Sequence, residues 1–247
     1  MYREALAAFE FAVICDEQFV GAYLEIGKIL EKQGLYNQAI RNYELTLSLE
    51  DPTSFAYLRM GKCHQALQNE SLALDYFKKT IHEDPLLDKG WIAIIDFYIQ
   101  KNKHKKALYY LNKAIQIDTS NIEIWKQYAV VNNQLQCFEE VNIAYKEIVS
   151  LGNYELETWL EWAKVQRKLG DLDEAINTLL QGAEFFPESA EINYLLAGLY
   201  FTLTQEHKGI FYFKNSFLNF VIKSFNLVSL ASSNFPEETI LLKISED

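Results

Sequence analysis

The sequence predicts an all-α protein, an α-solenoid of 34-residue helix-turn-helix repeats, on three observations. Rows of 34 residues starting at Val20 align with one another in several columns. Apolar residues within a row recur at the spacing of one helix face. The 247 residues include only 4 Pro and 10 Gly, too few for the many tight turns of an all-β chain of this length.

Two columns of mostly small residues keep the rows in register. The first lies four residues after a large aromatic residue in five rows, and it reads Gly27, Gly61, Ile95, Ala129, Ala163 and Ala197. The second lies four residues before a large residue, and it reads Ala5, Ala39, Ala73, Ala107, Val141, Ala175 and Gly209. Helix backbones approach closely only where a side chain is small, and a large neighbour fills the adjoining gap. Each row therefore predicts two packed helices.

The first row illustrates the hairpin. From Tyr23 to Leu30, apolar or small residues lie at i, i+3, i+4 and i+7, on one face of an α-helix. Gly34 predicts the turn, and Gly170 stands in the same place four rows later. A second apolar helix face follows over 39–46. Proline ends the second helix of three rows, at Pro52, Pro85 and Pro187.

These columns, the glycine turn and the closing proline resemble the tetratricopeptide repeat family, and the stretches 31–39 and 167–175 are close to its central pattern. The resemblance implies that residues 1–19 form the second helix of an incomplete repeat. Residues 224–247 are expected to form a C-terminal capping segment, with a short final helix from Pro236. Six full repeats are expected at 20–53, 54–87, 88–121, 122–155, 156–189 and 190–223.

The fourth row departs most from the pattern. Asn132 and its two polar successors, together with Val141, replace residues that pack better in the other rows. Because the stability of a solenoid is a sum of row and junction contributions, we expect a local weak point over 122–150.

Composition excludes several classes of function. The net charge of −11 opposes binding to nucleic acid and to anionic membranes. The three cysteines, Cys15, Cys63 and Cys137, are odd in number and widely spaced, so they predict neither a disulfide framework nor a zinc site. There is no apolar run long enough to span a bilayer and no basic leader at the start. These features predict a soluble, cytoplasmic protein.

The sequence contains no recognisable catalytic pattern. The stretch from Gly21 to Lys28 superficially resembles a phosphate loop, but its glycines are five residues apart and Ile29 follows the lysine. The four histidines share no metal-ligand spacing. We therefore expect no enzyme activity, no cofactor and no metal.

The resemblance implies a binding surface, because in this family the first helices line a concave groove that holds peptides or partner helices. The thirty positions expected to face the groove carry eight basic and five acidic residues, or +3 in a chain of −11. We therefore expect an acidic, partly apolar protein segment as the partner. The candidate binding residues are Leu24, Lys28, Phe55, Leu58, Lys62, Ile92, Lys126, Leu160, Lys164, Arg167 and Tyr194.

Two other interpretations remain open at this stage. The groove lysines can simply keep an unused face soluble. Alternatively, the chain is a regulatory or targeting array of a larger protein, an idea that the half-row start favours. No group of residues in the sequence supports an enzyme. A pentatricopeptide array, which reads RNA, is excluded because it would repeat every 35 residues.

Overall fold

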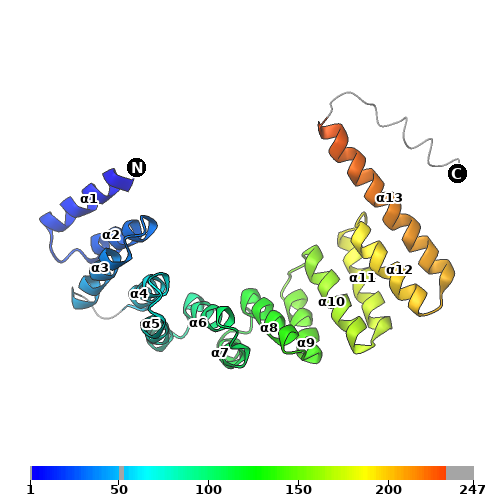
Figure 1. Cartoon of the computed structure of the whole chain (residues 1–247), viewed down its shortest axis with the longest axis horizontal. Coiled ribbons are helices and arrows are strands. Elements are labelled where there is room, and N and C mark those ends of the chain that lie inside the picture. The colour runs from blue at the N-terminus through cyan, green and yellow to red at the C-terminus, as the bar shows by residue number, and fades with distance from the viewer. Residues whose placement is uncertain (1, 50–52, 232–247) are drawn as a thin grey trace. The chain divides into compact units, whose positions relative to one another are not determined.

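The computed structural model describes residues 2–49 and 53–231. Within these residues the fold is all-α, with thirteen helices and no strand (Figure 1). The helices are α1 Tyr2–Cys15, α2 Val20–Lys32, α3 Tyr36–Leu49, α4 Ser54–Ala66, α5 Glu70–Glu83, α6 Asp88–Gln100, α7 His104–Ile117, α8 Ile122–Gln134, α9 Phe138–Ser150, α10 Leu156–Leu169, α11 Leu172–Phe185, α12 Ala190–Thr202 and α13 Glu206–Ala231.

The chain divides into two compact units, Met1–Cys137 (unit 1) and Phe138–Asp247 (unit 2). The division falls between α8 and α9, inside the fourth predicted row. Each predicted row contains a first helix of 13 or 14 residues and a second helix, from the pair α2 and α3 to the pair α12 and α13. The half row at the start corresponds to α1.

The last helix extends past the expected repeat. α13 has 26 residues, whereas the other second helices have 13 or 14. The expected boundary between the sixth repeat and the capping segment, at 223/224, therefore lies inside a continuous helix. The final helix expected from Pro236 lies outside the described residues.

In unit 1 the small column residues lie directly against large aromatic rings of the second helices. A Cβ atom added to Gly27 would lie 2.5 Å from the ring of Tyr43, and one added to Gly61 would lie 2.5 Å from the ring of Phe77. Both rings are fully buried. The glycines thus permit the close approach of paired helices that the column pattern predicts.

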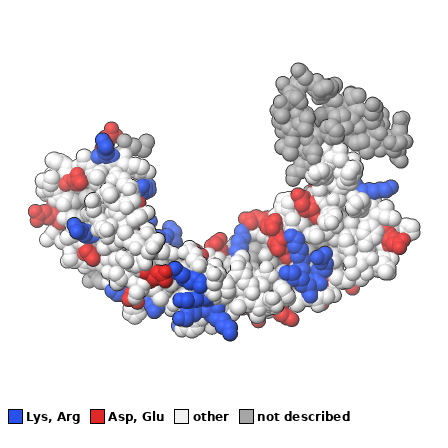
Figure 2. Space-filling view, in the orientation of Figure 1, with Lys and Arg blue, Asp and Glu red and all other residues white. Residues whose placement is uncertain are grey.

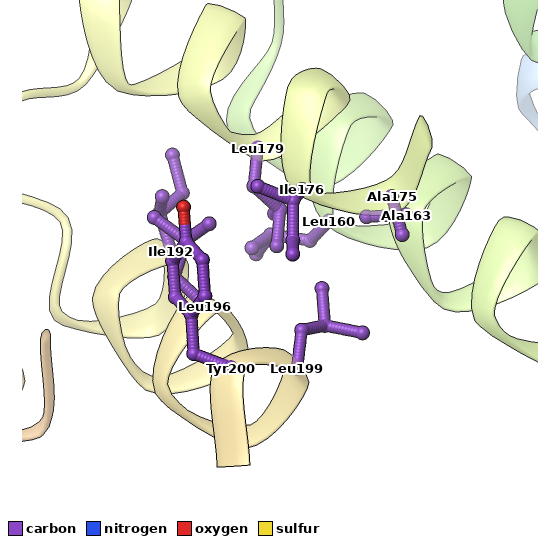
Figure 3. Close-up of a cluster of buried hydrophobic side chains, with 9 residues drawn as sticks. All are labelled: Leu160, Ala163, Ala175, Ile176, Leu179, Ile192, Leu196, Leu199 and Tyr200. Carbon is purple, nitrogen blue, oxygen red and sulfur yellow. The ribbon is translucent and has the colours of Figure 1, made fainter. Parts of the chain in front are cut away.

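The core of unit 2 joins three consecutive helices (Figure 3). Side chains of α10 and α11 meet the inner face of α12, and all are buried. The cluster consists of Leu160, Ala163, Ala175, Ile176, Leu179, Ile192, Leu196, Leu199 and Tyr200. A first helix is therefore held by both helices of the preceding row.

The turn between the two helices of each row has one backbone geometry throughout. Gly34 and Gly170 have the positive φ that their prediction as turn residues requires, at 76° and 88°. The four other rows place a residue other than glycine at this position with φ between 53° and 62°: Gln68, Asn102, Gln136 and Thr204. In each row the next residue's N–H bonds to a carbonyl five residues earlier, as Asn69 does to His64, which closes the first helix.

In the fourth row, the polar side chain of Asn132 is buried and forms a hydrogen bond. Asn132 donates through Nδ2 to the Tyr128 carbonyl oxygen at 2.9 Å, within its own helix. This bond satisfies the Asn132 side-chain donor. The side chain is nevertheless polar at a register position where Leu30 and Tyr98 provide apolar surface in other rows.

Candidate protein-binding surfaces

The candidate residues come from the first helices, and the structure separates them by exposure. Phe55, Lys62, Arg167 and Tyr194 are exposed, whereas five others are partly buried: Leu24, Lys28, Ile92, Lys126 and Lys164.

Leu58 and Leu160 are buried, which corrects the expectation that they face a groove openly. A first helix packs against helices on more than one side, so its exposed stripe is narrower than helical periodicity alone suggests. Leu160 belongs to the core cluster of Figure 3 and reaches the surface only as part of the lining of a groove described below.

Two of the predicted basic residues are paired with carboxylates on their own helices. Lys28 Nζ lies 2.6 Å from Glu25 Oε1, and Lys164 Nζ lies 2.5 Å from Glu161 Oε1. Glu25 and Glu161 stand three residues before the lysines, at a register position that was not assigned to the groove. Part of the expected positive charge is therefore compensated locally.

Polar side chains link neighbouring first helices of unit 1. Arg59 Nε on α4 forms an ion pair with Glu31 Oε1 on α2 at 3.1 Å, and the same oxygen accepts a hydrogen bond from the Tyr43 hydroxyl at 2.7 Å. Burial and this hydrogen bond raise the pKa of Tyr43 above its ordinary range. Further along, Gln65 donates to Gln100 at 3.0 Å.

The third link of this kind joins α8 to α6. Gln127 Nε2 donates to Asp96 Oδ1 at 3.0 Å. Burial raises the pKa of Asp96, while the hydrogen bond from Gln127 and the charge of Lys62 act in the opposite direction. The polar links hold the first-helix face of unit 1 in a defined arrangement.

A recess lies between α4 and α6 on this face, and we call it the α4–α6 recess. Its volume is about 130 Å³. It is lined by Lys62, Gln65, Lys89, Ile92, Ala93, Asp96 and Gln100. Two lysines and one carboxylate give the recess a positive balance of charge. Beside it on α4, Phe55 lies under the cations of Lys28 and Arg59, at 5.1 and 5.7 Å from its ring centre.

Unit 2 carries a larger and more apolar depression, which we call the unit 2 groove. Its volume is about 710 Å³, and it lies between α10, α12 and α13. It is lined by Glu157, Leu160, Lys164, Ala190, Glu191, Tyr194, Leu195, Phe213, Ser216, Phe217 and Phe220. The repeat pattern predicts a binding face on the first helices alone, so the lining residues of α13 lie outside the predicted site. The apolar run that starts at Phe217 was the available signal.

Basic side chains gather at two places on the face shown in Figure 2, one over α6 and α7 and one over α10. The last turn of α10 contains two basic residues, Arg167 and Lys168. Lys168 lies over the ring of Phe138, 4.7 Å from its centre, so part of this charge packs on the protein itself.

The described part of the chain contains no cluster of three or more His, Cys, Asp or Glu side chains that could hold a metal ion. Burial and the nearby Glu31 raise the pKa of Cys63 to about 12, which makes this thiol a poor nucleophile. None of the described helices is both long and apolar enough to cross a membrane.

Solved structures similar to this chain are tetratricopeptide-repeat proteins. The C-terminal part of such a protein from Cytophaga hutchinsonii superposes with a TM-score of 0.71 at 16% identity, covering 87% of this chain and 89% of that one. YrrB, described as a TPR protein with an unusual peptide-binding site, gives a TM-score of 0.55 at 15% identity, covering 75% of this chain and 95% of that one.

Among curated proteins, anaphase-promoting complex subunit 3 of Schizosaccharomyces pombe is 19% identical over 213 residues. The match covers 85% of this chain but only 32% of the relative, so the chain spans about a third of that protein's length.

Family models described as tetratricopeptide repeat match residues 20–51, 55–86, 91–121 and 160–207, together more than half of the chain. The helical hairpins, the small-residue columns and these matches agree, and the chain belongs to the tetratricopeptide repeat family.

Proposed function

We propose that this chain is a protein-interaction array and that the first-helix face of unit 1 binds an acidic, partly apolar segment of a partner protein. Tetratricopeptide-repeat proteins generally mediate protein–protein interactions. The observation that carries the finer proposal is the α4–α6 recess, where Lys62 and Lys89 flank a small depression on an exposed face.

The neighbouring side chains fit such a segment. Phe55 is exposed beside the recess and Ile92 is partly exposed within it, so both offer apolar contact. Lys62 and Lys89 are exposed and can meet carboxylates of the partner. Apolar contacts of this kind supply affinity, while exposed charges mainly steer the encounter and fix the register.

The polar links between first helices support the proposal in a second way. The pairs Arg59–Glu31 and Gln65–Gln100 hold α2, α4 and α6 before a partner arrives. A surface that is already ordered loses less conformational freedom on binding. The relatives are consistent with this role, since one is by name a subunit of a complex and another is described as having a peptide-binding site.

The proposed role is binding without catalysis. Its partner class is protein or peptide, and no step of the role requires a cofactor.

Two labelled peptides of equal length test the proposal, one alternating Glu with Leu and the other alternating Lys with Leu. Fluorescence anisotropy should give the Glu peptide the tighter binding, and the preference should shrink as salt is raised because the charges are exposed. Lys62→Glu with Lys89→Glu should weaken binding of the Glu peptide by about tenfold.

The matched control places the same two charge changes on second helices of unit 1, as Lys78→Glu with Lys105→Glu. Both of these lysines are exposed. If the control pair weakens binding as much as the recess pair, the effect is one of net charge and the proposed surface is wrong.

A further inference from the structure

Unit 1 carries a strongly basic segment that the proposed function does not use. From Phe97 to Ile117 the chain contains five lysines and neither Asp nor Glu. The segment includes the turn after α6 and the whole of α7, and basic side chains gather over these helices in Figure 2. All five lysines are exposed, and they are Lys101, Lys103, Lys105, Lys106 and Lys113.

Six exposed residues of α7 form one continuous face. Ala107, Leu111 and Ala114 are buried on the opposite side of the helix. The six exposed residues stand at i, i+1, i+4, i+7, i+8 and i+11, which places them within about a third of the helix circumference. We call these residues the α7 basic face, and they are Lys105, Lys106, Tyr109, Asn112, Lys113 and Gln116.

Most of the positive charge in this segment is not compensated by carboxylates. Lys101 forms an ion pair with Glu70 of α5. The other four lysines form no ion pair with any carboxylate of the described residues. Lys113 lies over the ring of Tyr109, 4.6 Å from its centre, in a contact that leaves the cation charged. The α7 basic face therefore presents cations together with an aromatic ring.

The position of these lysines is unfavourable for the helix itself. The N-terminal end of a helix carries a partial positive charge, which favours acidic residues there. The first turns of α5, α9, α11 and α13 contain acidic residues, whereas the first turn of α7 contains Lys105 and Lys106. Residues that oppose a local preference on an exposed surface indicate a role in binding.

The net charge of −11 does not offset this face, because the acidic excess lies mainly in the other unit. Unit 1 contains 15 Lys and Arg against 17 Asp and Glu, a balance of −2. Unit 2 contains 8 against 17, a balance of −9. At physiological ionic strength, exposed charges more than about 8 Å apart are largely screened. The local balance on α7 therefore decides which partner this face attracts.

We propose that the α7 basic face binds a single-stranded nucleic acid. Exposed lysines add little affinity for the carboxylates of a protein. Their contacts with phosphates, in contrast, release condensed counterions and thereby contribute directly to binding. A protein segment would also need apolar contacts, and α7 has no exposed aliphatic side chain between Lys105 and Gln116. Charge and surface chemistry together favour a nucleic acid over an acidic protein segment.

The other residues of the face fit the bases of such a strand. The Tyr109 side chain is 54% exposed, so a base can stack on its ring. Stacking of this kind needs an unpaired base, which favours a single strand over a duplex. Asn112 and Gln116 lie one turn apart on the same face, and their amides can form hydrogen bonds with base edges.

This inference differs from the proposed function in both surface and partner. The proposed function places an acidic protein segment on the first helices of unit 1, whereas the α7 basic face belongs to a second helix. Either proposal can therefore fail alone. The expectation that the net charge opposes nucleic-acid binding describes the average over the chain and not this face.

A labelled, unstructured single-stranded RNA of about twelve nucleotides tests the proposal by fluorescence anisotropy with the full chain. If four lysines each contact a phosphate, the logarithm of the association constant should fall against the logarithm of salt concentration with a slope of about −3. Lys105→Gln with Lys106→Gln should make this slope shallower by about 1.4. The unfolding midpoint should not fall, because the change removes exposed cations from a helix N-terminus.

The aromatic contribution is tested separately from the charge. Tyr109→Ala should weaken RNA binding by about tenfold and leave the salt slope unchanged, because stacking releases no counterions. The matched control is Lys62→Gln with Lys89→Gln, which removes the same charge from exposed positions on the first-helix face. This pair should leave both the affinity for RNA and the salt slope unchanged.

Three results would overturn the proposal. An equal change of slope in both lysine pairs would mean that binding follows net charge and not the α7 basic face. Duplex RNA bound as tightly as the single strand, together with unaltered binding by Tyr109→Ala, would mean that no base stacks there. Displacement of the RNA by the alternating Glu and Leu peptide as effectively as by unlabelled RNA would assign the face to an acidic protein segment.

Discussion

The first-helix faces of the two units differ in what lies between neighbouring helices. In unit 1, Arg59 of α4 forms an ion pair with Glu31 of α2, and Gln127 of α8 donates a hydrogen bond to Asp96 of α6. Each of these polar side chains therefore contacts the preceding first helix. In unit 2, the equivalent register position in α12 holds Leu195, which lines an apolar groove. This register position therefore carries a polar link in α4 and α8 and an apolar groove residue in α12. The same backbone repeat can therefore present different chemistry to different partners.

Glycines give the largest expected contrast between the units. Gly61→Ala should lower the free energy of unfolding by about 1–3 kcal/mol, because the new Cβ would lie 2.5 Å from Phe77 and overpack unit 1. Gly198→Ala on α12 should raise it by about 0.5–1 kcal/mol, since no atom outside the local helix backbone lies within 4 Å and alanine favours helix.

Urea denaturation of both variants measures the difference in the free energy of unfolding. A Gly61→Ala protein as stable as the wild type would show that Phe77 moves aside without cost. The close packing of Gly61 against Phe77 would then contribute nothing to the free energy of unfolding.

The tryptophans at one register position give an intermediate contrast. Trp125 Nε1 in unit 1 donates to the Thr119 carbonyl oxygen at 2.8 Å, whereas Trp159 Nε1 in unit 2 is buried with no hydrogen-bond partner among the described residues. Replacing each by Phe loses similar ring volume, but only Trp125→Phe loses a hydrogen bond. Trp125→Phe should therefore cost about 1 kcal/mol more than Trp159→Phe.

Thermal unfolding of the two tryptophan variants, each compared with the wild type, checks this order. Equal losses of stability would mean that the Trp125 hydrogen bond contributes no net free energy, because its formation only replaces a hydrogen bond to water.

The turn position gives the smallest contrast. Gln68 in unit 1 has φ of 62° where Gly170 in unit 2 has φ of 88°. Gln68→Gly should stabilise the protein by about 0.5–1 kcal/mol, because a left-handed conformation costs a residue with a Cβ atom more than it costs glycine. Gly170→Ala should lower the free energy of unfolding by a similar amount, although no neighbouring atom obstructs the new Cβ.

Chemical denaturation of this pair isolates backbone strain from packing. If Gln68→Gly destabilises instead, the flexibility that glycine adds to the unfolded chain outweighs the relief of strain.

The sequence predicts the helices well because their signals are local and repeated. The spacing from Tyr23 to Leu30 and the column from Ala39 to Ala175 both follow from contacts within a row. The turn geometry at Gln68 and Thr204 was not predictable from residue type, because the backbone bonds that close the helix impose it without glycine.

The candidate surfaces were harder to predict because they depend on contacts between rows. Leu58 is apolar at a position expected to face a groove, and only the packing of several helices around α4 shows that it is buried. The pairing of Lys28 with Glu25 depends on which rotamers the neighbouring helices permit. The exposure of Phe213 depends on the unbroken course of α13, which lies beyond the repeat pattern.

The continuity of α13 has a consequence for how the number of repeats is set. α13 runs without interruption through 220–223, the positions that correspond to the connection 186–189 between the helices of the preceding row. A repeat ends only where the backbone is made to leave the helix, so an array stops growing when one such interruption is missing. Inserting Pro-Gly near residue 220 would thus be a minimal route to a longer array, and losing a junction elsewhere a route to a shorter one. Array length in such proteins can then change by a few substitutions at a junction, without gain or loss of a whole 34-residue segment.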